Sequence, residues 1–222
     1  MAGYKPRICA SIVDGDLPAI KKVGSLVDLF EVRIDLIGSN WREIAASLKK
    51  PWIACNRRAE EGGKWGGGEH KRITELLGAL ELGAAIIDIE LNTPDLAKIV
   101  KETKGKAECL ISYHNIKETP TLKKLKEILE SEKDAGADIC KVVTTARSFK
   151  DNLVVLQLIG EYPKLNIVAF AMGAAGQVSR IFGPLVGGYF SYASIETGKE
   201  SAEGQVTVKD LRKIYGMFGD ER

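Results

Sequence analysis

The chain has 222 residues, of which 45% are apolar and 28% charged, the range of a globular protein with one full hydrophobic core. Its 32 basic and 30 acidic residues are well mixed and give a net charge of +2, which argues against nucleic acid as a partner. Because no apolar stretch is long enough for a signal peptide or a membrane span, the sequence predicts a cytoplasmic protein without membrane contact.

The four cysteines, at positions 9, 55, 109 and 140, each lie in or at the end of a short apolar run. None of them forms a CxxC pair or lies near a histidine at the spacing of zinc ligands. This pattern predicts reduced, buried thiols and no metal site.

Eight short apolar runs recur along the chain and predict the buried strands of a parallel sheet. The runs are residues 7–13, 27–36, 52–55, 85–91, 107–113, 138–144, 166–172 and 188–193.

Segments with helix signals separate most of these runs. They are residues 17–23, residues 41–49 behind an Asn40–Glu43 capping box, an apolar face over 73–80 closed by Gly83, residues 95–104, a segment opened by Thr119 and Pro120, and segments opened by Ser148 with Asp151 and by Thr207 with Asp210.

Alternation of eight strands with helices predicts an α/β fold, a single (β/α)8 TIM barrel that occupies residues 1–222. The alternative is a doubly wound open sheet, which would normally carry a Gly-rich phosphate turn after one strand. Residues 62–63 and 66–68 are rich in glycine, but they lack the GxGxxG order and follow no convincing strand. The barrel is therefore favoured.

The second predicted strand carries three charged residues within an apolar run. Glu31, Arg33 and Asp35 share one face of this strand by the period-two rule. Buried charges are costly unless they pair with one another or with a ligand. They are candidates for a site at the carboxyl ends of the strands, where barrel enzymes carry their chemistry. The alternative is a structural ladder of ion pairs.

The sixth predicted strand carries a lysine, Lys141, on the same face as Ile139 and Val143. A buried lysine is rare, and removal from water disfavours the charged form of an amine. The neutral amine attacks a carbonyl carbon, so Lys141 predicts a Schiff-base-forming enzyme that acts on a ketone. The alternative is a lysine paired with Glu31 or another carboxylate inside the barrel.

Further polar residues follow the third and fifth predicted strands. After the third, Arg57 or Arg58 is placed to meet an anionic or hydroxylated ligand, and Glu61 is expected to turn back over the barrel mouth. The alternative for this stretch is a plain charged loop. His114 ends the fifth strand, and an imidazole there suits proton transfer.

Two more candidates follow the seventh and eighth strands. Arg180 lies near the start of a short helical turn, and an arginine can grip a carboxylate through two parallel hydrogen bonds. The long polar stretch at 194–206 is expected to form a mobile lid, with Ser201 and Gln205 reaching the ligand. The alternative for this stretch is a plain flexible loop.

Six short motifs, each beside its proper strand, are similar in kind and order to those of the type I 3-dehydroquinate dehydratases, the Schiff-base class of that enzyme. They are ExRxD at 31–35, Arg-x-x-x-Glu-Gly-Gly at 57–63, SYHN with a following TP at 112–120, DIxK at 138–141, MGxxGxxSR at 172–180 and SAxGQ at 201–205. Each motif is weak alone, but the resemblance runs nearly end to end.

The resemblance implies a cofactor-free dehydration of 3-dehydroquinate to 3-dehydroshikimate. Lys141 is expected to form an imine with the ring ketone. His114 is expected to remove the neighbouring proton and to return one to the departing hydroxyl, with Glu31 orienting and charge-balancing His114. The residues also fit independently, because the reaction needs one amine, one acid–base group and one carboxylate anchor.

The same resemblance implies the contacts that bind the substrate, and it suggests a homodimer. The expected contacts are Arg33 and Arg57 to ring hydroxyls with Glu61 in support, and Arg180 to the carboxylate with Ser201 and Gln205 closing from the lid. Two residues depart from the family pattern, Asn115 where Asp is usual and Glu203 where Pro is usual. We expect Glu203 to make the lid looser and more acidic.

Two other classes of function compete with this interpretation. A class I aldolase also uses a lysine on a barrel strand, but such enzymes commonly act on phosphorylated sugars, and no clear phosphate cradle follows the last two strands. A non-catalytic barrel that serves as a binding or scaffold protein would have to carry a buried lysine, a histidine and two arginines at strand ends without chemistry.

Overall fold

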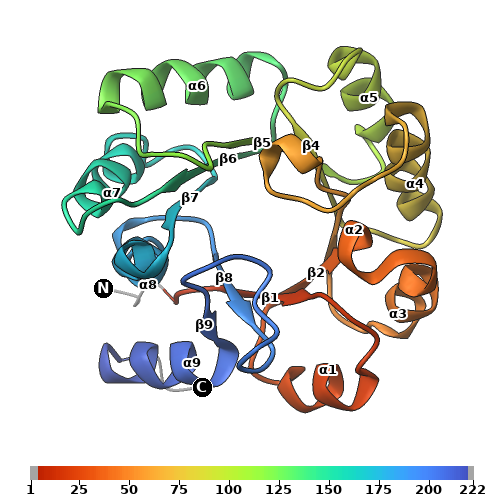
Figure 1. The fold of residues 1–222 in the computed structure, drawn as a ribbon, viewed down its shortest axis with the longest axis horizontal. Coiled ribbons are helices and arrows are strands. Elements are labelled where there is room, and N and C mark those ends of the chain that lie inside the picture. Colours follow the sequence, from red (N-terminus) through yellow and green to blue (C-terminus); the bar gives the residue numbers. More distant parts are fainter. Residues whose placement is uncertain (1–4, 220–222) are drawn as a thin grey trace.

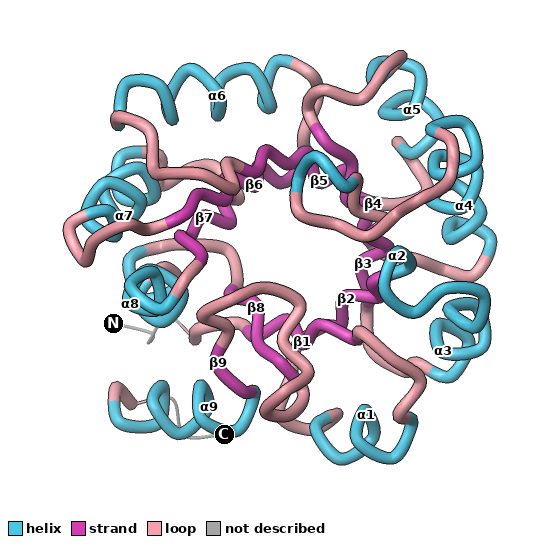
Figure 2. Tube along the Cα trace, viewed as in Figure 1, coloured by secondary structure: helices cyan, strands magenta, loops and turns pink. Residues whose placement is uncertain are grey.

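Nine parallel strands form one curled sheet in the computed structural model, which describes residues 5–219 (Figure 1). Strands β1 to β8 follow one another around the barrel (Figure 2). The short strand β9 pairs with the edge of β8 that does not face β1. The strands are β1 (Ile8–Ile12), β2 (Leu29–Arg33), β3 (Trp52–Cys55), β4 (Ile86–Glu90), β5 (Glu108–His114), β6 (Ile139–Thr145), β7 (Ile167–Met172), β8 (Ser191–Ser194) and β9 (Val206–Thr207). A backbone hydrogen bond of 2.7 Å from Tyr189 to Ile167 links the segment before β8 to β7.

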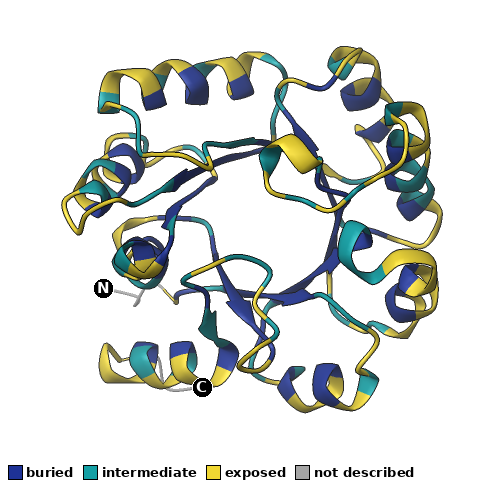
Figure 3. Ribbon diagram, viewed as in Figure 1, coloured by how far each residue is buried: buried dark blue, intermediate teal, exposed yellow. Residues whose placement is uncertain are grey.

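Helices surround the sheet, with buried faces turned inward and exposed faces outward (Figure 3). They are α1 (Leu17–Val23), α2 (Ile34–Ile37), α3 (Trp41–Ser47), α4 (Glu69–Glu81), α5 (Leu96–Thr103), α6 (Leu122–Asp134), α7 (Asp151–Glu161), α8 (Gln177–Phe182) and α9 (Val208–Met217), with 3-10 turns at Gly38–Asn40, Ala59–Glu61, Ala174–Gly176 and Pro184–Val186. None of the helices within residues 5–219 has the length and apolar character needed to cross a membrane.

The period-two alternation of each strand divides the core into two parts. Inward side chains such as Ile139, Val143 and Val168 fill the barrel interior. Outward side chains such as Cys140, Val142 and Ala169 pack against the helices. Because Lys141 lies between Ile139 and Val143 on the chain yet alternates with Cys140 and Val142, its side chain belongs to the interior.

The predicted TIM barrel is confirmed, and the doubly wound sheet is wrong because the strand order runs in one direction around the barrel. Each of the eight apolar runs coincides with a strand, although β5, β6 and β8 extend one residue beyond the predicted runs. The four cysteines are buried and free, as predicted. The predicted domain limits at residues 1–4 and 220–222 lie outside the described residues.

Some local predictions are wrong. The second strand ends at Arg33, and α2 begins at Ile34, so Asp35 lies in a helix rather than on the strand face shared with Glu31. The cap of α6 is Thr121, whose hydroxyl accepts a hydrogen bond from the Lys124 amide, and not Thr119.

Other helix starts follow the sequence signals to different degrees. Asn40 precedes α3 without a capping hydrogen bond from its side chain. Thr207 caps α9 as predicted, because its hydroxyl accepts from the Asp210 amide at 3.2 Å. The short strand β9 before α9 was not predicted, since two residues carry no readable alternation.

Candidate active site

A cavity opens at the carboxyl ends of the strands. Nine of the candidate site residues of the sequence line it: Glu31, Arg33, Arg57, Glu61, His114, Lys141, Arg180, Ser201 and Gln205. Asp35 and Arg58 do not. The cavity offers about 60 Å³ to the centres of water-sized molecules, whereas a single water needs about 10–15 Å³. It therefore has room for several waters or for part of a small polar molecule.

The amine of Lys141 lies among carboxylates at the floor of this cavity. Nζ lies 2.8 Å from Oδ2 of Asp88 and 3.8 Å from Oε1 of Glu31. It also lies 4.4 Å from the centre of the Tyr192 ring. Lys141 is thus paired with carboxylates inside the barrel, as the alternative interpretation of the sequence proposed. The same amine also borders the cavity, where a small ketone can reach it.

Asp88 is a site residue that the sequence reasoning missed. It is 1% exposed and accepts hydrogen bonds from Arg57 Nη2 at 2.6 Å, from Ser112 Oγ at 2.7 Å and from Lys141 Nζ at 2.8 Å. Burial raises the pKa of Asp88, but the charges of Arg57 and Lys141 outweigh burial and hold this pKa well below its usual value. The signal was an acidic residue on the inward face of the apolar run at 86–90.

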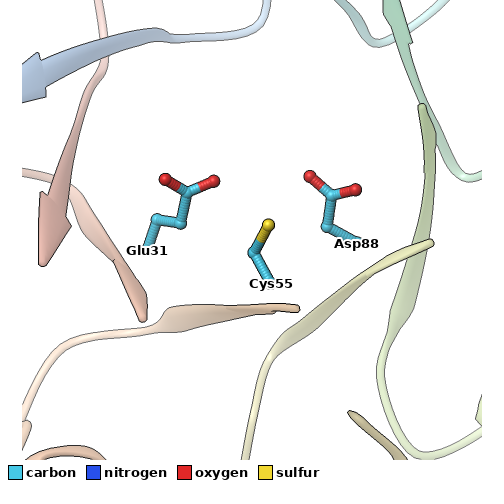
Figure 4. Close-up of side chains that lie close together, drawn as sticks. All are labelled: Glu31, Cys55 and Asp88. Carbon is cyan, nitrogen blue, oxygen red and sulfur yellow. The ribbon is translucent and has the colours of Figure 1, made fainter. Parts of the chain in front are cut away.

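Glu31, Cys55 and Asp88 project from neighbouring strands into the barrel interior (Figure 4). Their potential ligand atoms lie within 4.8 Å of one another, as in a metal site. However, Lys141 and Arg57 already place cationic groups against these atoms. Burial raises the pKa of the Cys55 thiol well above its usual value, which favours the protonated form, a poor metal ligand. Glu31 and Asp88 therefore serve as the negative counterparts of Lys141, beside a neutral Cys55.

His114 is paired with Glu61, and the expectation that Glu31 orients His114 is wrong. Nδ1 of His114 lies 2.8 Å from Oε2 of Glu61. Glu31 instead accepts a hydrogen bond of 2.9 Å from Ser11 and faces Lys141. The reason is the chain path: Glu31 is fixed within β2, whereas the 3-10 turn with Glu61 folds back over the mouth toward β5.

The pKa values of this pair place its titration near neutral pH. Burial, with the nearby charges of Arg57 and Lys141, lowers the pKa of His114 well below 6.5. Burial also raises the pKa of Glu61 to about 7, although Arg57 opposes this rise. Near pH 7 the imidazole is therefore neutral. When it donates its Nδ1 proton to an ionised Glu61, Nε2 is free to accept a proton from a ligand.

Two arginines on the β2 and β3 side are held firmly. Arg33 forms two hydrogen bonds with the Asp35 carboxylate, at 2.9 and 2.7 Å. Arg57 is 3% exposed and lines the cavity, whereas Arg58 points outward and donates to the Asn92 carbonyl at 3.2 Å. The structure thus brings Arg57 to the cavity rather than Arg58.

Arg180 is a buried guanidinium without a carboxylate partner among residues 5–219. It stacks on the Phe170 ring at 4.1 Å, and its Nη2 donates to the backbone carbonyl of Glu203 at 3.3 Å. Its buried Nε has no hydrogen-bond partner in the described part of the chain. Burial lowers the pKa of Arg180 to about 9. An uncompensated cation that borders a cavity is suited to bind an anion.

Arg180 lies in the last turn of α8 (Gln177–Phe182), so the predicted benefit from a helix start is wrong. The β7–α8 connection first forms a 3-10 turn at Ala174–Gly176, which delays the helix.

The segment between β8 and β9 lies in front of β8, at one edge of the barrel opening (Figure 1). The side-chain oxygen of Gln205, Oε1, accepts a hydrogen bond from the backbone amide of Ser201 at 2.8 Å. The side-chain nitrogen of Gln205, Nε2, donates to Oγ of Ser11 at 3.2 Å. The carbonyl of Glu203 accepts from the Gly173 amide at 3.1 Å, while the Glu203 side chain is exposed. The segment is thereby held against β1 and the β7 loop.

Together, the fold and the cavity define a class of protein, a barrel that brings a lysine, a histidine–carboxylate pair and an arginine without a carboxylate partner among the described residues to one cavity. The family model for type I 3-dehydroquinase matches residues 8–222. The chain belongs to the type I 3-dehydroquinase family, which confirms the resemblance seen in its motifs. This membership favours neither a class I aldolase nor a non-catalytic barrel.

Relatives and solved structures agree with this assignment. The chain is 43% identical over 210 residues to the 3-dehydroquinate dehydratase of Dehalococcoides mccartyi strain CBDB1, covering 95% of each chain. It is 36% identical over 219 residues to that of Methanocaldococcus jannaschii, covering 95% of this chain and 98% of the relative.

Among solved structures, the type I enzyme of Clostridium difficile with covalently modified comenic acid gives a TM-score of 0.85 at 22% identity, over 98% of this chain and 94% of that one. The 3-dehydroquinate dehydratase of Aquifex aeolicus VF5 gives 0.82 at 26% identity, over 97% of this chain and all of that one.

Proposed function

We propose that the chain dehydrates 3-dehydroquinate to 3-dehydroshikimate through an imine on Lys141, with His114 as the acid–base group. The observation that carries this proposal is the placement of the Lys141 amine in the same cavity as the His114–Glu61 pair and the open Arg180. These three features meet the three needs of the reaction: a nucleophile, a proton carrier and a carboxylate anchor.

The first requirement of the reaction is a group that binds the carboxylate of the substrate. Arg180 binds the substrate carboxylate, because its guanidinium lacks an anionic partner in the described chain. Arg33 and Arg57, with Glu61 in support, contact the ring hydroxyls from the opposite wall of the cavity. Held between these groups, the ring ketone faces the floor of the barrel, where Lys141 lies.

The amine of Lys141 passes a proton to His114, which lines the same cavity, and attacks the ketone carbon. His114 returns this proton to the hydroxyl of the carbinolamine, which leaves as water and gives a protonated imine. Asp88 and Glu31, at 2.8 and 3.8 Å, stabilise the positive nitrogen of this imine. The imine withdraws electrons from the neighbouring carbon and acidifies its C–H bond.

His114 removes this proton through Nε2, which the Nδ1 contact with Glu61 leaves free. The electron pair forms the new carbon–carbon double bond as the hydroxyl departs, and His114 returns its proton to that hydroxyl so that water leaves. Hydrolysis of the imine then releases the enone product and restores the lysine. Glu31 thus acts beside Lys141, and Glu61 takes the orienting role toward His114.

The segment at 194–206 acts as a mobile lid over this cavity. Ser201 and Gln205 line the cavity from the lid side, and they are bonded to each other and to Ser11. A lid held by these contacts shields the reacting groups from water, and its movement admits the substrate. Release of the contact between Glu203 and Gly173 would open it.

A cytoplasmic location and a homodimer belong to the same proposal. Four free cysteines suit a reducing compartment. Apolar side chains exposed near the ends of α7 and α9 provide a surface for a second copy: Phe149, Leu153, Met217 and Phe218. Sedimentation equilibrium of the purified chain tests the homodimer.

The function itself is tested by following the absorbance of the conjugated enone formed from 3-dehydroquinate. We expect turnover by the wild type, and severe loss in both Lys141→Ala and His114→Ala. Near-normal turnover by the Lys141 variant would exclude the imine route, and no turnover by a folded wild type would exclude the reaction.

A further inference from the structure

Arg72 of α4 is a fully buried arginine that does not line the active-site cavity. Its guanidinium donates to Glu90 Oε2 at 2.7 Å and to the Asn56 carbonyl at 2.9 Å. It also binds both carboxylate oxygens of Glu69, each at 2.8 Å. A buried charge of this kind is costly unless each of its donors is satisfied, so the arrangement around Arg72 is a specific one.

Glu90 connects Arg72 to the active site. The side chain is 1% exposed, and its second oxygen, Oε1, lies 3.0 Å from Nη1 of Arg57. The same oxygen accepts the backbone amide of Arg58 at 3.1 Å. One carboxylate is therefore shared between an arginine outside the cavity and an arginine that lines it.

The contacts continue from Arg57 to the reactive lysine. Nη2 of Arg57 lies 2.6 Å from Asp88, and Asp88 lies 2.8 Å from Nζ of Lys141. Positive and negative groups thus alternate from Arg72 through Glu90, Arg57 and Asp88 to Lys141. Every contact in this series is 3.0 Å or shorter.

We propose that Arg72 is a positioning residue for catalysis, which acts through Glu90 to hold Arg57 and Asp88 in place around the Lys141 amine. This inference rests on the proposed imine function. Without Arg72, Glu90 keeps one arginine partner instead of two and draws the Arg57 guanidinium away from Asp88. A displacement of about 1 Å at a reacting group is enough to lower a rate strongly.

The charged residues of this series also affect the pKa of Glu61, the partner of His114. Glu90 and Asp88 raise the pKa of Glu61, whereas Arg57 and Arg58 lower it. Removing the positive charge of Arg72 leaves Glu90 less compensated. The pKa of Glu61 then rises further, and the acid limb of the pH–rate profile moves to higher pH. A purely structural role for Arg72 would not move this limb.

The test uses the purified full-length chain and 3-dehydroquinate, with kcat, KM and the pH profile of kcat/KM measured for Arg72→Met and Arg72→Lys. Arg42→Met is the matched control, because Arg42 on α3 is half-exposed and pairs with Glu75, another carboxylate of α4, at 2.9 Å. Circular dichroism and thermal unfolding establish that each variant is folded.

We expect Arg72→Met to lose kcat by about tenfold or more and to shift the acid limb upward, with KM also raised because Arg57 contacts the ring hydroxyls. Arg72→Lys keeps the positive charge but lacks the several planar N–H donors of a guanidinium. Its loss of kcat is therefore smaller, and the acid limb of its pH–rate profile stays near that of the wild type. Arg42→Met is expected to match the wild type.

A folded Arg72→Met with wild-type kcat and an unmoved acid limb would overturn the inference. If Arg72→Met does not fold, Arg72→Lys decides: a lowered kcat in the folded variant supports the positioning role, and wild-type kcat refutes it. Failure of the wild type to form the enone is a separate result, because it refutes the proposed function itself.

Discussion

Nδ1 of His114 lies 2.8 Å from Oε2 of Glu61, and this contact couples the protonation of the two groups. The pKa of Glu61 is raised to about 7, and that of His114 is well below 6.5. Below pH 7, a protonated Glu61 donates its proton to Nδ1, and the imidazole then carries its own proton on Nε2. Above pH 7, the ionised Glu61 accepts from Nδ1–H, which leaves Nε2 able to act as a base.

We therefore predict that kcat/KM rises with pH through about 7, the value to which burial raises the pKa of Glu61, rather than through the pKa of a free imidazole. In Glu61→Gln the limb near pH 7 should vanish, because the amide does not titrate, and activity should fall by about tenfold or more. Steady-state rates from pH 5 to pH 9 measure both effects. An acid limb that persists near pH 7 in this variant would assign it to another group.

The second prediction concerns the guanidinium of Arg180, which has no carboxylate partner among the described residues. Replacing it with Met in Arg180→Met removes the charged hydrogen bonds proposed for the substrate carboxylate, each of which contributes about 1.5–3 kcal/mol. We expect kcat/KM to fall by about 10- to 150-fold per lost bond. Arg147→Met is the control, since Arg147 is exposed and does not line the cavity. A wild-type kcat/KM in Arg180→Met would show that the carboxylate binds elsewhere.

The third prediction concerns the docking of the lid on the β7 loop. Gly204 has a φ of +79°, and a Cβ there would lie 2.3 Å from the Gly173 carbonyl oxygen. Gly204→Ala should therefore displace the lid, raise KM and leave the unfolding temperature of the barrel nearly unchanged.

Gly198 provides the control for backbone strain in the same segment. Its φ is +82°, but nothing lies within 4 Å of the position of an added Cβ. Gly198→Ala shares the conformational cost of Gly204→Ala without the collision. Equal KM values for the two variants would show that the contact between Gly204 and Gly173 does not govern closure.

The sequence predicts the barrel well, because each of the strands β1 to β8 lies in a short apolar run and most of these runs are followed by a helix signal. It also predicts that Lys141 points inward, since the alternation over Ile139 and Val143 determines the face. The position of His114 at the end of a strand identified it as a lining residue, and the position of Arg180 in the segment after the seventh strand did the same. These are local patterns, and local patterns can be read from one chain.

The partners of these residues could not be predicted in the same way. Glu31 and Glu61 are both acidic residues near the mouth, and only the path of the loop after β3 decides which of them reaches His114. Asp88 was overlooked although it faces inward, because its partners Arg57 and Lys141 come from distant parts of the chain. Pairing depends on the curvature of the sheet, which the alternation of residues does not encode.

The imine on Lys141 is the central claim, and it is tested most directly by reducing the enzyme with borohydride during turnover of 3-dehydroquinate, followed by peptide mass spectrometry. The account predicts irreversible inactivation and a reduced substrate adduct on Lys141, absent from Lys141→Ala and absent when a sugar phosphate replaces the substrate. Active enzyme that keeps turning over with no adduct on Lys141 would contradict it.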